Sequence, residues 1–80
     1  MFINKEKLDV KVTELKEDYR VKFEERAVLD NFTWNLKKKF PGVKCVISPA
    51  DSQNSYCWIK KDTVPSKEEV KKLADKIANY

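Results

Sequence analysis

The apolar positions of this chain change their period along the sequence, and each period predicts one kind of element. Residues 8–13 and 19–24 alternate between apolar and polar side chains, which is typical of half-buried strands. The two segments are joined by a polar connection, so they predict a hairpin. Residues 25–40 then place apolar side chains three and four apart, which predicts an amphipathic helix ending at Pro41-Gly42.

The second half of the chain repeats this order. Residues 43–48 and 56–60 alternate again across a polar connection, and they predict a second hairpin. Ser66 and Glu69 have the spacing of a capping box and begin a helix that runs to about Tyr80. The order ββαββα predicts one domain over residues 1–80, an α+β fold of two layers with both helices on one face of a four-stranded, mainly antiparallel sheet.

Strand alternation also predicts which side chains the helices leave uncovered. The consistent apolar set is expected to face the helices, and it consists of Val10, Val12, Val21, Phe23, Val43, Cys45, Ile47, Cys57 and Ile59. The opposite face is expected to carry six basic and two acidic residues together with two aromatic rings, and its members are Lys7, Asp9, Lys11, Arg20, Lys22, Glu24, Lys44, Val46, Tyr56, Trp58 and Lys60.

The charge is concentrated in the same part of the chain. The protein has 80 residues and a formal net charge of +4. Residues 34–61 contain six lysines and one aspartate, a net charge of +5, whereas residues 1–33 sum to −1 and residues 62–80 to zero. Both tryptophans also lie between residues 34 and 61, so the positive charge and the largest aromatic rings coincide.

Lysines neutralise phosphates, and aromatic rings stack on unpaired bases, so this face predicts a non-enzymatic module that binds RNA or single-stranded nucleic acid. The alternatives are a protein–protein inhibitor or modulator with no nucleic-acid role, a homodimer packed through the open sheet face, and a solvated face covered by a loop or by the N-terminal residues. The expected nucleic-acid contacts are Arg20, Lys22, Lys44, Lys60, Lys61, Tyr56 and Trp58.

A second candidate contact lies on the first helix. At 100° per residue, Trp34 falls nearly opposite the apolar stripe and beside Lys37 and Lys38. An exposed tryptophan often marks a contact surface, so these three residues are expected to meet a partner or to extend the nucleic-acid site. The alternatives are that the helix packs on two sides, or that the ring packs on the lysine stems of its own helix.

The sequence predicts neither a cofactor nor a metal site, and it predicts no enzymatic activity. The chain has no histidine, and its two cysteines are too few for a four-ligand zinc site. Cys45 and Cys57 are both expected to face inward, directly opposite one another if residues 46–56 close as a symmetric hairpin. Paired reduced thiols are the favoured interpretation, with a cross-strand disulfide or redox switch as the alternative.

The first residues include charges and contain no apolar run of seven or more, so no secretory signal or membrane span is expected and the protein is predicted to be cytoplasmic. From Tyr19 onward, the order strand, helix ending in Lys39-Phe40-Pro41-Gly42, strand, polar loop, strand and helix resembles the DinI-like fold of small recombinase modulators. That family has a strongly acidic last helix, whereas this one is charge-balanced, so no functional residue is transferred.

In style, the short, lysine- and asparagine-rich, nearly glycine-free sequence resembles small host-takeover and counter-defence proteins of large tailed phages. These include inhibitors of host defence nucleases and toxins, such as the RNA-binding TifA-type toxin inhibitors. The resemblance implies an inhibitor acting in the host cytoplasm.

Overall fold

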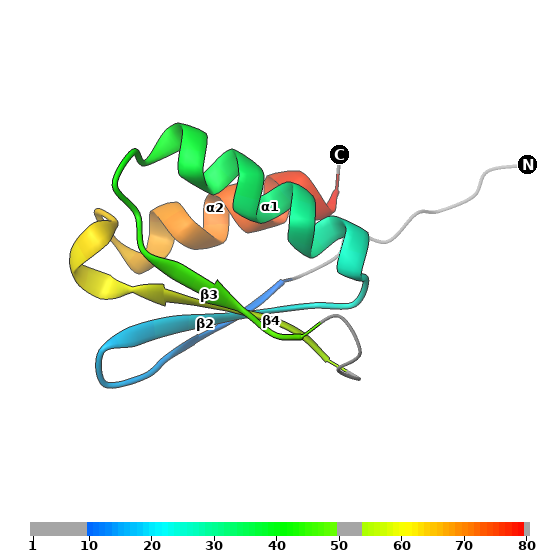
Figure 1. The fold of residues 1–80 in the computed structure, drawn as a ribbon, viewed down its shortest axis with the longest axis horizontal. Helices are drawn as coiled ribbons and strands as arrows, with labels where there is room; N and C mark the ends of the chain where they lie inside the picture. Colours follow the sequence, from blue (N-terminus) through cyan, green and yellow to red (C-terminus); the bar gives the residue numbers. More distant parts are fainter. Residues whose placement is uncertain (1–9, 50–53, 80) are drawn as a thin grey trace, which may run out of the picture.

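The four strands form one antiparallel sheet. The computed structural model describes residues 10–49 and 54–79, and all statements below concern these residues. The strands are β1 (Lys11–Glu14), β2 (Asp18–Phe23), β3 (Cys45–Ile47) and β4 (Ser55–Lys60), in the spatial order β1-β2-β4-β3 (Figure 1). Each predicted hairpin therefore supplies one central strand and one edge strand.

Both helices cover the same side of this sheet (Figure 1). Helix α1 (Arg26–Lys39) lies against β4 and β2, and helix α2 (Lys67–Ala78) lies against β1 and β2. This arrangement confirms the predicted two-layer α+β fold. The pattern did not predict the 3₁₀ helix η1 (Lys61–Thr63), which joins β4 to α2.

The pairing register confirms the predicted division of side chains between the two faces. Val12 pairs with Val21, Val21 with Cys57, and Cys57 with Ile47. Paired residues of an antiparallel sheet point to the same side, so these four share the helix-covered face. Every residue of the predicted inward set is either buried or packed against the core.

The core is centred on one stripe of α1. Leu29, Phe32 and Leu36 have no exposed surface, and the Phe32 ring lies 5.0 Å from that of Phe23 on β2. Burying a side chain of this size contributes about 1.5–3 kcal/mol, so this stripe is the main attachment of α1 to the sheet.

The helix boundaries follow their sequence signals. After α1, the Val43 N–H donates to the Phe40 carbonyl at 3.0 Å, and Gly42 adopts φ +92°, a conformation that favours glycine. Before α2, the Ser66 hydroxyl accepts from the Glu69 N–H at 3.3 Å, which confirms that half of the capping box.

The strand ends differ from the expectation. β2 begins at Asp18, one residue early, because the Leu15 N–H bonds to the Asp18 carbonyl and closes a tight connection. β3 begins only at Cys45, because the Lys44 N–H donates to the Thr63 hydroxyl. The predicted positions Lys7, Leu8 and Asp9 lie outside the described residues.

Candidate nucleic-acid interface

The side of the sheet away from the helices is called the open face. Three rows of side chains cross it, because paired residues lie side by side. The rows are Lys11, Lys22 and Tyr56; then Thr13, Arg20, Trp58 and Val46; then Asp18, Lys60 and Lys44.

A stacked group of three side chains occupies the middle of the open face. The Arg20 guanidinium lies 5.0 Å from the centre of the Tyr56 ring, and the Tyr56 and Trp58 rings are 5.6 Å apart at 48°. All three are partly exposed. A guanidinium over an aromatic ring and a tilted ring pair are both attractive, so this group is preorganised as a platform of π faces.

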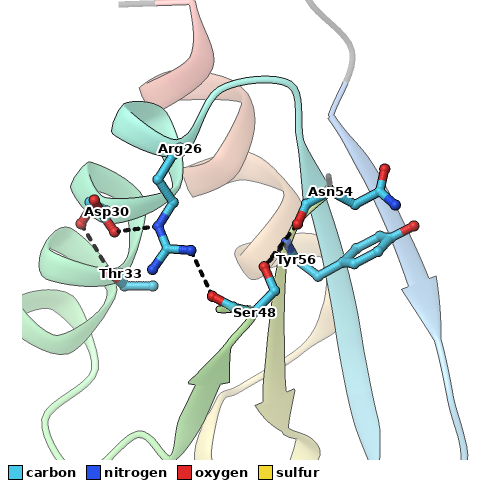
Figure 2. Close-up of polar contacts among 6 residues, drawn as sticks. All are labelled: Arg26, Asp30, Thr33, Ser48, Asn54 and Tyr56. Carbon is cyan, nitrogen blue, oxygen red and sulfur yellow. Dashed lines mark hydrogen bonds and ion pairs between the residues drawn. The ribbon is translucent and has the colours of Figure 1, made fainter. Parts of the chain in front are cut away.

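The backbone of Tyr56 is held by a polar network at the end of β3, shown in Figure 2. The Ser48 hydroxyl accepts from the Tyr56 N–H at 3.0 Å and donates to the Asn54 carbonyl at 2.9 Å. The Ser48 carbonyl is thereby left for Arg26 of α1, whose Nη1 donates to it at 2.6 Å. The network therefore ties the start of β4 to the first turn of α1.

The basic side chains surround this platform. Lys11, Lys22 and Lys44 are exposed and have no carboxylate within 4.0 Å among the described residues. The Lys60 Nζ lies 3.7 Å from Asp18. Asp18 was not predicted to lie on the open face, and its charge offsets that of Lys60.

Lys61 lines a hollow with Lys44 and Lys60, but its ammonium group is directed toward β1. Its Nζ donates to the Glu14 carboxylate at 2.8 Å and lies 5.5 Å from the centre of the Tyr19 ring. Glu14 and Tyr19 pair with one another and have the parity of the helix-covered side. The hydrogen bond from Lys61 holds the pKa of Glu14 below its usual range.

Trp34, Lys37 and Lys38 lie on α1. The Trp34 side chain is 61% exposed, and it projects away from the buried positions Phe32 and Leu36. The Lys38 Nζ lies 4.3 Å from the centre of its ring. The Trp34 ring therefore projects from the helix layer away from the sheet, whereas Lys37 of the same group lines a hollow together with Lys44 and Trp58 of the open face.

The two cysteines do not lie directly opposite one another, because the strand register is not the one that a symmetric closure of residues 46–56 would give. Cys45 pairs with Ile59 and Cys57 pairs with Ile47, so the free thiols are diagonal neighbours. A hydrogen bond from the Cys57 thiol lowers the pKa of Cys45 to about 6, although partial burial opposes this and Lys37 adds to it. The same bond and its own burial raise the pKa of Cys57.

Comparison with protein-family models, curated proteins and solved structures finds no match for this chain. Among the described residues, no helix has the length and apolar character needed to cross a bilayer. Nor does this part of the chain bring three metal-ligating side chains together.

Proposed function

We propose that this protein binds RNA or single-stranded nucleic acid through its open face. The observation that carries the proposal is the Arg20–Tyr56–Trp58 platform surrounded by lysines on a sheet face that neither helix covers. Each base stacked on an aromatic side chain contributes about 1–3 kcal/mol, with little dependence on sequence.

The lysines have a matching role. Lys11, Lys22, Lys44 and Lys60 lie around the platform and would contact phosphates, while Tyr56 and Trp58 stack bases. Four phosphate contacts on a single strand correspond to a salt slope of about −2.8, or about a 50-fold loss of affinity between roughly 50 and 200 mM salt. Lys61 would contribute only after leaving Glu14.

The test is fluorescence anisotropy with labelled dodecamers of uridine and of deoxythymidine. We expect binding that weakens with this salt slope, and Trp58→Ala is expected to weaken it by about 5- to 150-fold. Trp34→Ala is the matched control, because it removes the same side chain from the other side of the molecule. No binding of either strand at about 100 µM protein and low salt would refute the proposal.

A protein partner is the second candidate, favoured by the exposure of Trp34 beside Lys37 and Lys38. An inhibitor of a host defence nuclease or toxin would use this ring as a binding hot spot. In that case Trp34→Ala abolishes capture of one protein after nuclease treatment, while Trp58→Ala leaves it unchanged.

A homodimer through the open face would instead elute early in size-exclusion chromatography and protect Trp58 fluorescence from quenchers.

A further inference from the structure

The edge of the sheet at β3 presents backbone groups that the fold does not use. The Lys60 N–H donates to the Lys44 carbonyl at 2.9 Å, and the Ser48 N–H donates to the Tyr56 carbonyl at 3.0 Å. Hydrogen bonding alternates along an antiparallel strand, so the N–H and C=O groups of Cys45 and Ile47 point away from β4. Among residues 10–49 and 54–79, nothing bonds to these outward groups.

At the opposite edge of the sheet, side chains of α2 bond to part of the outward backbone. At β1, the Val10 N–H donates to the Asp75 carboxylate at 3.1 Å, and the Lys71 Nζ donates to the Val10 carbonyl at 3.1 Å. Helix α2 therefore occupies the start of that edge. β3 has the entirely apolar sequence Cys-Val-Ile, which lacks the charges that usually protect an edge strand from pairing.

The side chains around the β3 edge define what fits there. Val46 is 67% exposed on the open-face side and adjoins a shallow hollow of about 530 Å³ that Trp58 also lines. Two lysines flank the strand, Lys44 on the open-face side and Lys37 from α1 on the other, and both line the hollow. Neither has a carboxylate within 4.0 Å in the described part of the chain.

We propose that an extended acidic segment of another protein adds to the β3 edge as a fifth strand. The added segment runs antiparallel to β3, and its residue beside Val46 is apolar. The following residue of the segment lies beside Cys45 and directs an acidic side chain toward Lys37. The residue after that directs an acidic side chain toward Lys44. The two residues beside Cys45 and Ile47 exchange the main-chain hydrogen bonds.

Charge argues against a second copy of this chain as the occupant. Pairing two β3 strands around a two-fold axis would bring four lysines to one interface, Lys37 and Lys44 from each copy, none of which has an ion-pair partner among the described residues. Like charges brought together across an interface disfavour association, whereas an acidic strand neutralises them.

The test follows backbone amide exchange by NMR in the full chain, with the peptide Ac-Ser-Val-Val-Glu-Glu-Ser-NH₂. At ten times Kd, the Cys45 and Ile47 amides are expected to exchange about tenfold more slowly. The Val12 amide on the β1 edge is the internal control and stays unchanged. N-methylation of the first glutamate, which faces Cys45, abolishes the effect, whereas N-methylation of the second valine, beside Val46, does not.

Charge reversal completes the test. Lys44→Glu with Lys37→Glu is expected to lose the acidic peptide and gain one in which both glutamates are lysine. Three outcomes would overturn the proposal: no slowing at millimolar peptide, equal binding of both peptides to the native chain, or slowing of the same two amides without peptide. If the exchange of the Cys45 and Ile47 amides slows as the protein concentration rises, the occupant of the edge is a second copy of the chain. If a deoxythymidine dodecamer slows their exchange, the edge belongs to the nucleic-acid site.

Discussion

Replacing Ser48 with alanine tests how the fold positions the platform. The Ser48 side chain belongs to a residue that is only 4% exposed, and its hydroxyl makes two hydrogen bonds, from the Tyr56 N–H and to the Asn54 carbonyl (Figure 2). Alanine keeps the backbone conformation and removes both bonds. The Tyr56 N–H then loses the acceptor that ends the β3–β4 ladder.

The expected cost follows from burial. A hydrogen bond of this type contributes about 0.5–1.5 kcal/mol, and a buried donor left without an acceptor costs about 1–3 kcal/mol. We therefore expect Ser48→Ala to lower the free energy of unfolding by about 2 kcal/mol. For a domain of this size, that corresponds to a fall in Tm of about 8–16 °C.

Thr63→Val is the matched control. The Thr63 hydroxyl has the same role at the other end of β3, where it accepts from the Lys44 N–H at 3.2 Å and donates to the Lys60 carbonyl at 2.7 Å. These bonds are exposed, so water replaces them and the loss is expected to stay below about 1 kcal/mol. Urea denaturation measures both variants. Equal losses, or a loss below about 0.5 kcal/mol for Ser48→Ala, would refute the reasoning.

Three other predictions concern stability and titration. Leu36→Ala, at a fully buried position, is expected to cost about 2–5 kcal/mol in urea denaturation, whereas Val46→Ala stays within about 0.5 kcal/mol; similar losses would contradict the assigned core. The thiolate is the reactive form of cysteine, so iodoacetamide should label Cys45 with a half-maximal rate near pH 6, and a midpoint above pH 8 would contradict the thiol pairing. Lys61→Met is expected to raise the pKa of Glu14 toward its usual value in a carbon-13 NMR titration, and an unchanged midpoint would contradict their hydrogen bond.

The sequence predicts the two layers and both faces because they depend on local periodicity. In each strand, the alternation of apolar and polar residues decides which side chains are buried. A shift of one residue would expose side chains such as Val21 or Ile59, and the free-energy cost of exposing them fixes which face each residue occupies. The open face follows from the same alternation. Its basic and aromatic composition was therefore readable at Arg20, Tyr56 and Trp58 without any knowledge of the strand order.

The details that sequence reasoning missed depend on contacts between distant segments. The offset of Cys45 from Cys57 follows from the register in which Ser48 pairs with Tyr56, and the Ser48 carbonyl also accepts from Arg26, 22 positions away. In the sequence, Lys61 directly follows Lys60, the last residue of β4. The direction of the Lys61 side chain depends on η1 and on Glu14, 47 positions earlier. Neither of these contacts can be recognised from the periodicity of the sequence.

The two proposed surfaces meet along β3, and the charge that they share at Lys44 has a thermodynamic consequence. Lys44 lies in the third row of the open face and also flanks the β3 edge. A glutamate of an added strand that pairs with Lys44 removes one cation from the phosphate-binding set, which corresponds to a change of about 0.7 in the salt slope for a single strand. Because coupling between two ligands is reciprocal, a bound nucleic acid would weaken the acidic strand by the same factor. The chain would then favour one ligand at a time, through the charge of Lys44, although only the added strand uses the outward backbone groups of β3.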